Sequence, residues 1–329
     1  MISLLLLCWA AVVAVAAGPA LANRAWTRSA PRLAVGVWLG AELSVTLAVL
    51  GAGLLLAVPP AAAAAGLPGI VQACLQALAN LSAPNLFLSI AGLAAMALLI
   101  ARLAVGLTVT FTAARRWRRH HRAALLPVSR PGPDGESVIL DHAVPVIYCL
   151  PGRPGQIVVT SGALDVLSPQ EFAAVLGHEQ AHLRGRHHLL LALVTAFHRA
   201  FPGLPLAGTA EAEVRRLVEH LADDRAGAQH DRRLMASAIV RLADATPEHA
   251  LGAATAAADR VRRMLAPATP LRAAQRLLAT AAIGALLALP LAAVAATAGT
   301  ALHGSTCSHP SGVKPPVQHP QAGNPAAAA

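Results

Sequence analysis

The sequence predicts a mostly α-helical integral membrane protein with four membrane spans and one water-facing domain between the third and fourth spans. Only 13% of the residues are charged and 56% are hydrophobic, whereas about a quarter of the residues of a soluble protein are charged. All acidic residues except Glu42 fall between Asp134 and Asp259, which places the water-facing domain there. The apolar residues gather in four blocks long enough to cross a bilayer, at about residues 2–22, 33–58, 86–112 and 277–302.

The positions of the arginines predict how these spans are oriented. Arginines lie between the first two spans and directly after the third, whereas residues 59–85 carry no charge. Because basic loops stay on the cytoplasmic side, we expect a plasma-membrane protein with both termini outside and the large domain in the cytoplasm. Orientation in the lipid bilayer explains the net charge of +10 better than nucleic acid binding does. The arginines concerned are Arg24, Arg28, Arg32, Arg115, Arg116, Arg118, Arg119 and Arg122.

These observations divide the chain into four parts. Residues 1–112 are expected to form three spans, and residues 113–270 the cytoplasmic domain. Residues 271–302 form the fourth span, and residues 303–329 a short disordered tail outside the cell. The first segment ends in A-L-A at residues 20–22, which is typical of a signal-peptide cleavage site. Because it lacks a basic start, we expect it to remain as a span.

Two ionisable residues interrupt the spans. Glu42 and Arg102 each lie roughly 14 Å from the expected cytoplasmic surface, at about 1.5 Å per helical residue. Charges at this depth are costly and are usually paired, which predicts that Glu42 and Arg102 meet. The alternative is a protonated Glu42 and an Arg102 whose side chain extends to the surface.

The four cysteines form no C-x-x-C pair, so they indicate neither a thiolate zinc site nor a redox motif. Cys74 and Cys307 both fall on the expected outer face, which raises the hypothesis of a disulfide between them. Nothing in the sequence specifies an oligomeric state.

Within the water-facing domain, short extended segments precede several helices. Residues 143–150 and 156–160 are rich in Val, Ile and Tyr and flank a Pro- and Gly-rich turn, which predicts a small β-hairpin. The apolar run 189–197 is too short to span a membrane and is expected to be a core or membrane-surface helix. Residues 231–245 and 248–265 are expected to form amphipathic helices with Arg-rich outer faces.

A metal-binding pattern lies on a helix with a clear start. Residues 168–171 supply a capping serine, a proline and a glutamate at the third helical position. Two turns later, residues 177–182 read G-H-E-Q-A-H. His178 and His182 share one helical face, so both imidazoles reach one zinc ion, which needs a third ligand and a water. Glu179 is placed to take a proton from that water as it attacks a carbonyl.

A second polar cluster supplies the remaining parts of such a site. Glu219 and Asp223 lie four residues apart in an apolar segment and share a helical face. Glu219 is the expected third ligand, and Asp223 the expected hydrogen-bond partner that fixes the tautomer of a ligand histidine. The alternative is a solvated helix face in which these carboxylates pair with nearby arginines. Together with H-E-x-x-H, the pattern favours the metal site.

At this point the chain resembles the BlaR/MecR-type membrane metallopeptidases, a gluzincin family in which two histidines and a glutamate hold zinc. Three spans before the motif and a fourth after it carry the resemblance, together with the G-H-E-Q-A-H motif and the Glu-x-x-x-Asp pair. Residues 157–164 (I-V-V-T-S-G-A-L) also fit. The resemblance implies one Zn²⁺ per chain on His178, His182 and Glu219. It also implies Glu179 as the base and Asp223 as a supporting residue.

The resemblance further implies regulated proteolysis of a winged-helix transcriptional repressor, which would be the protein substrate. The known receptors carry a penicillin-binding sensor domain after the fourth span, and the short tail at residues 303–329 does not supply one. In many zinc peptidases a strand beside the motif helix pairs with extended substrate. Residues 157–159 are one choice for that strand, with core packing as the alternative.

Other readings remain open. A membrane quality-control protease of the HtpX/Ste24-like type shares both zinc motifs, and a non-catalytic receptor or scaffold would use the zinc structurally. The presence of Glu179 argues against a scaffold, because a structural site needs no base. Tyr148, His220 and Arg225 are candidates for stabilising the oxyanion. The spacing of His187, His188 and His220 does not make them better ligands than the motif histidines.

Overall fold

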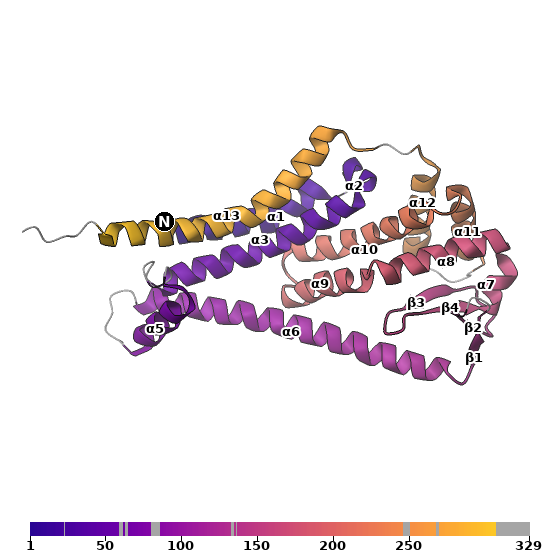
Figure 1. Ribbon diagram of the computed structural model, residues 1–329, viewed down its shortest axis with the longest axis horizontal. Helices are drawn as coiled ribbons and strands as arrows, with labels where there is room; N and C mark the ends of the chain where they lie inside the picture. Colours follow the sequence, from indigo (N-terminus) through magenta and orange to yellow (C-terminus); the bar gives the residue numbers. More distant parts are fainter. Residues whose placement is uncertain are drawn as a thin grey trace, which may run out of the picture.

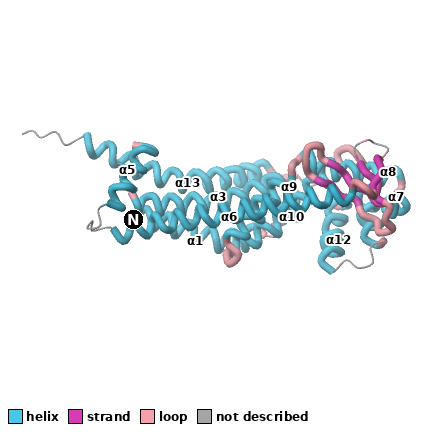
Figure 2. The backbone as a smooth tube through the Cα atoms, turned by 90° about the horizontal axis from the view of Figure 1, so that it is seen from below, coloured by secondary structure: helices cyan, strands magenta, loops and turns pink. Residues whose placement is uncertain are grey.

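The computed structural model describes residues 1–22, 24–58, 62, 65–79, 86–132, 135, 137–245, 251–267 and 270–306. The molecule is elongated, and Figure 2 shows the strands gathered at the end opposite the N-terminus. Long helices make up the rest, so the prediction of a mostly helical chain with a small sheet is confirmed. The side chains of Cys74 and Cys307, and with them the hypothetical disulfide, lie outside the described part.

In the described part of the chain, four helices are long and apolar enough to cross a membrane. They are α1 (Ile2–Leu21), α3 (Pro31–Ala57), α6 (Leu86–Leu125) and α13 (Ala273–Thr306). The central helix is α3, which packs against the other three (Figure 1). Two shorter helices, α2 (Ala25–Ser29) and α5 (Gly66–Ala79), occupy the connections. The basic stretch after the third apolar block continues α6 without a break, because nothing before residue 125 ends the helix.

Two helices that follow the H-E-x-x-H motif pack among the spans. They are α9 (His187–Ala200) and α10 (Pro205–Ala226), which lie between α3 and α6 in Figure 1. Trp38 of α3 is almost fully buried in one apolar cluster with Val194 of α9 and Leu217 of α10. The spans therefore form part of the core that holds the helix carrying Glu219.

The expected pair between Glu42 and Arg102 is not formed. Glu42 is 5% exposed, and its Oε1 has no hydrogen-bond partner among the described residues. Arg102 instead donates from Nε to the carbonyl oxygen of Ala200 at 2.8 Å, and its guanidinium lies over the Phe201 ring. The physical reason is that the last carbonyl groups of α9 have no partner within their own helix and need donors. Arg102 lies next to this helix end and supplies one.

The sheet has four short strands in the order β1-β2-β4-β3. The strands are β1 (Ser129–Pro131), β2 (Ser137–Leu140), β3 (Ile147–Leu150) and β4 (Gln156–Thr160). The expected hairpin is present as β3 and β4, with Tyr148 opposite Val158. β2 pairs in parallel with β4, and this pairing was not predicted.

The expectation that residues 157–159 bind substrate as a free strand edge is wrong, because β4 lies inside the sheet. Both sides of β4 are paired, and Ile157, Val158 and Val159 are at most 1% exposed. These residues pack in the core, which was the alternative. The free edge next to the motif helix belongs to β3.

The remaining helices complete the domain around the motif helix. They are α7 (Ser161–Val166), α8 (Pro169–Arg184), α11 (Arg232–Asp244) and α12 (Leu251–Leu265). Val175 of α8, Met235 of α11 and Met264 of α12 belong to one buried cluster. This packing brings α12 against the polar face of α10.

Candidate metal centre

The helix α8 is fixed at its start by a capping box. The Ser168 hydroxyl accepts from the backbone N–H of Glu171, and the Glu171 carboxylate accepts from the N–H of Ser168. Glu171 is 3% exposed and also accepts a hydrogen bond of 2.6 Å from Ser237 of α11. This anchoring sets the rotation of α8, and with it the direction of the motif side chains two turns later.

Three side chains converge where α8 crosses α10. The Nε2 atoms of His178 and His182 lie 3.1 Å apart. Nε2 of His178 lies 3.5 Å from Oε2 of Glu219, and Nε2 of His182 lies 3.5 Å from Oε1 of the same carboxylate. Tetrahedral zinc ligands at about 2.0–2.1 Å from the ion lie roughly 3.3–3.4 Å from one another. One ligand atom from each of the three side chains lies within 4.8 Å of the other two, so the group can hold a metal ion. No other cluster of at least three such groups occurs in the described ranges.

The second nitrogen of His178 contacts Asp223. Its Nδ1 lies 3.0 Å from Asp223 Oδ1, and both side chains are nearly fully buried. A proton on Nδ1 that is donated to this carboxylate leaves the Nε2 lone pair free for a metal. Asp223 thus lies beside His178, and its role in supporting a metal ligand stays a prediction.

The electrostatics of the cluster show how strongly it attracts positive charge. Burial alone would lower the pKa of His178, but hydrogen bonds to Asp223 and Glu219 raise it above its ordinary value. Burial would raise the pKa of Glu219, but hydrogen bonds from His178 and His182 hold it well below its ordinary value. A divalent cation would replace the shared proton in this arrangement.

The cluster opens into a cavity of about 470 Å³, which we call the catalytic pocket. Glu179, next to the first ligand histidine, lines this pocket, as do Tyr148 and Cys149 of the edge strand β3. The side chain of Glu219 is 37% exposed, so the cluster faces the open side of the pocket. The carboxylate of Glu179, a potential metal-binding group and a strand edge that is unpaired among the described residues therefore meet in one place.

Residues 113–313 match the sequence model of peptidase family M48. The chain belongs to peptidase family M48. M48 peptidases are zinc-dependent metalloproteases, in agreement with the His-His-Glu cluster. The match does not extend to the first three spans, and the BlaR/MecR subtype stays a prediction. The comparisons with curated proteins and with solved structures find no match.

One residue of this M48 domain was missed from the sequence. Arg260 of α12 donates to both oxygens of Asp223, from Nη2 at 2.6 Å and from Nε at 3.0 Å. Its Nη1 lies 3.4 Å from Glu219 Oε2, and the side chain lines the catalytic pocket. The expectation that the arginines of α12 face outward is therefore wrong for Arg260, and also for Arg263, which pairs with Asp224 at 2.7 Å.

The three candidates for stabilising the oxyanion are separated in space. Tyr148 lines the catalytic pocket, with its hydroxyl 2.5 Å from Nε2 of His121. His220 is fully buried beside Asp259, and Arg225 lines a different cavity. Only Tyr148 of these three lies where substrate would bind, and Arg260 joins it there.

The catalytic pocket also contains a thiol. Burial and the nearby Glu179 carboxylate raise the pKa of Cys149 above its ordinary value. The thiol is therefore protonated at neutral pH and does not compete as a thiolate for the metal.

Proposed function

We propose that this protein is a membrane-embedded zinc endopeptidase with its active site in the cytoplasm. The observation that carries the proposal is the placement of Glu179 in one pocket with His178, His182 and Glu219, against the free edge of β3. The four apolar helices support the membrane location. The arginines at the membrane borders support the orientation.

Each residue of the site has a separate role in hydrolysis. When bound, zinc supplies a Lewis acid that acidifies a water molecule and polarises the substrate carbonyl. Glu179 accepts the proton of the attacking water and passes it to the departing amine. Asp223 holds His178 in the required tautomer, and Arg260 holds Asp223. Arg260 and Tyr148 are the donors in the pocket for the developing oxyanion.

The substrate enters as an extended chain along β3. The edge of this strand offers backbone donors and acceptors next to α8, and Tyr148 and Cys149 line the pocket. Pairing with such an edge gives binding that depends little on side chains. It also places a backbone carbonyl beside the metal-binding cluster.

Two biological roles fit this activity. Three spans before the motif favour regulated cleavage of a winged-helix repressor, with that repressor as the partner. Membership of family M48 is equally compatible with an HtpX/Ste24-like quality-control protease. A scaffold with structural zinc is disfavoured by Glu179, which no structural site requires.

The activity is tested with the purified full-length chain in detergent and an unstructured model protein as substrate. We expect cleavage by the wild type, loss of cleavage with a chelator and recovery on addition of Zn²⁺. Glu179→Gln should bind one zinc ion per chain, because all three ligands remain, but should not cleave. Zinc binding without any cleavage by the wild type would instead support the scaffold.

The role is tested in cells by comparing new protein N-termini between the wild type and Glu179→Gln. If a single repressor loses its cleavage site in the variant, the antirepressor role is supported. If many membrane proteins lose theirs, quality control takes its place.

A further inference from the structure

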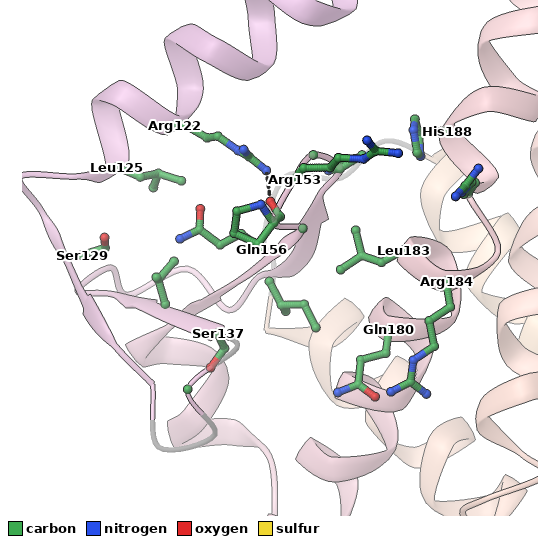
Figure 3. Close-up of a pocket in the computed structure, with 18 of the residues that line it drawn as sticks. Arg122, Leu125, Ser129, Ser137, Arg153, Gln156, Gln180, Leu183, Arg184 and His188 are labelled. Carbon is green, nitrogen blue, oxygen red and sulfur yellow. Dashed lines mark hydrogen bonds between the residues drawn. The ribbon is translucent and has the colours of Figure 1, made fainter.

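A second, larger cavity lies beside the catalytic pocket. It has a volume of about 1110 Å³ and is formed by the end of α6, the loop between β3 and β4, and the junction of α8 and α9. Figure 3 shows Arg122 reaching from α6 to this loop. Its Nη2 donates to the carbonyl oxygens of Pro154 at 2.9 Å and Leu150 at 3.2 Å. One wall of the cavity is therefore fixed by hydrogen bonds. We call this second cavity the basic cavity.

The basic cavity is lined by four arginines that have no carboxylate partner among the described residues. They are Arg122, Arg153, Arg184 and Arg186, and the imidazole of His188 lies beside them. None of the described residues in its lining is acidic. The arginines that form ion pairs in the described ranges do not line this cavity; they are Arg215, Arg216, Arg241, Arg260 and Arg263. Such a concentration of unpaired guanidinium groups attracts anions.

Two further observations point to a ligand there. Nε of Arg122 and Nδ1 of His188 are buried without a hydrogen-bond partner among the described residues. Burial and the guanidinium groups of Arg118 and Arg186 also lower the pKa of His188. The lowered pKa reflects a positive potential inside the cavity. An anionic group would satisfy the donors and neutralise this potential.

The basic cavity continues the catalytic pocket. Pro151 and His188 line both. Along the chain, Tyr148 and Cys149 line the catalytic pocket, whereas residues 152–155 line the basic cavity. An extended peptide advances about 3.3 Å per residue. A substrate that follows β3 therefore passes from one cavity to the other within about three to five residues.

We propose that the basic cavity binds an acidic segment of the protein substrate, about three to five residues from the cleaved bond. This inference rests on the proposed peptidase function and assigns it a substrate class. An anionic lipid headgroup is the other possible ligand. The peptide is favoured because the cavity is continuous with the catalytic pocket and is walled by the β3–β4 loop and α8.

The proposal is tested by binding to the zinc-loaded full-length Glu179→Gln chain, in a zwitterionic detergent. The probes are labelled peptides of about twelve residues with a cluster of Asp and Glu near one end or the other. The uncharged comparison peptides carry Asn and Gln at the same positions. The variant Arg153→Gln/Arg186→Asn removes two exposed charges, and asparagine tolerates the left-handed backbone of residue 186 (φ 49°). Arg233→Gln/Arg262→Gln removes two exposed charges outside the cavity and is the control.

We expect the acidic peptide to bind at least about tenfold more tightly than its amide partner, because charge-assisted hydrogen bonds to arginine are strong. The preference should weaken as salt is added. It should fall to within about twofold in the cavity variant and persist in the control. Equal binding of both peptides, or no binding of either, would overturn the proposal. So would a preference that the cavity variant keeps.

Two additional measurements separate the related hypotheses. If the charge preference is present but the wild type cleaves no peptide, the proposed peptidase function fails while the cavity still binds acidic segments. If peptides show no charge preference, the cavity can still bind a lipid headgroup. In that case nanodiscs with anionic lipid bind the cavity variant less well than the wild type, whereas neutral nanodiscs bind both equally. The proposal is then wrong.

Discussion

The Nδ1 atoms of His182 and His187 lie 2.9 Å apart. Two ring nitrogens at this distance share one proton, so one donates and the other accepts. If Nε2 of His182 faces the metal, its proton sits on Nδ1, and Nδ1 of His187 accepts it. Burial and the nearby His182 lower the pKa of His187 to about 4, which keeps His187 neutral and able to accept. His187 therefore does for His182 what Asp223 does for His178.

Replacing His187 should weaken zinc binding. We expect His187→Ala to raise the Kd for zinc roughly 10- to 100-fold, because His182 loses the partner that fixes its tautomer. His187→Asn should recover part of the affinity through its amide oxygen. Competition with a chromophoric chelator at constant pH measures the Kd. His188→Ala is the matched control and should stay within about twofold of the wild type. An unchanged Kd in His187→Ala would show that the contact does not orient the ligand.

Arg260 should be required for efficient hydrolysis. Arg260→Gln removes the two hydrogen bonds to Asp223, and we expect kcat/KM to fall about 10- to 100-fold, as for other residues that support metal ligands. Arg260→Lys should not restore it, since an ammonium cannot bridge both carboxylate oxygens in the same plane. Initial rates on a fixed peptide measure the effect. The exposed Arg262 on the same helix gives the control Arg262→Gln, and equal losses in both variants would contradict a specific role for Arg260.

The parts of the site that the sequence predicted are those set by local geometry. His178, Glu179 and His182 follow from spacing along one helix, and the capping serine and glutamate set where that helix begins. Glu219 and Asp223 could be found because they lie four residues apart, one helical turn, in a segment with apolar residues at Leu217, Val218 and Leu221. These arguments need no knowledge of how the helices pack.

What could not be predicted depends on packing between distant segments. Arg260 faces Asp223 only because α12 packs against α10, whereas Arg262, two residues later on the same helix, is exposed. His187 reaches His182 because Arg186, between α8 and α9, has a left-handed backbone (φ 49°). Glycine is the residue that usually marks such a conformation, so an arginine at this position did not indicate it. The strand β2 was missed because its parallel partner β4 lies some distance along the chain.

Glu171 should stabilise the fold in a pH-dependent way. Burial would raise the pKa of Glu171, but hydrogen bonds from Ser237 and Ser168 hold it below its ordinary value of 4.5. Its stabilising effect is therefore fully present above pH 4.5 and is lost as pH falls through the lowered folded-state value. We expect Glu171→Gln to lower the free energy of unfolding by about 1–3 kcal/mol at pH 7.

Thermal unfolding of the zinc-free protein at pH 7 and near pH 3 tests this, because zinc would be released at the lower pH. The difference between wild type and Glu171→Gln should shrink on acidification. Asp244→Asn, at an exposed position on α11, is the control and should unfold like the wild type at both values. A difference that stays constant with pH would mean that the carboxylate charge is not what stabilises α8.

The packing of α9 against the third span predicts the effect of a larger residue at Gly106. A Cβ atom there would lie 2.5 Å from the carbonyl oxygen of Ala196, so α6 and α9 approach closely only because residue 106 is glycine. Gly106→Leu should force the helices apart and disturb the bond between Arg102 and Ala200, at a cost of about 1–3 kcal/mol. Val105, 60% exposed on the same helix, gives the control Val105→Leu, which should be neutral. Thermal unfolding in detergent compares the two. If Gly106→Leu unfolds at the wild-type temperature, α9 does not dock against α6 in this way, and the close approach at Gly106 does not contribute to the stability of the core that positions Glu219.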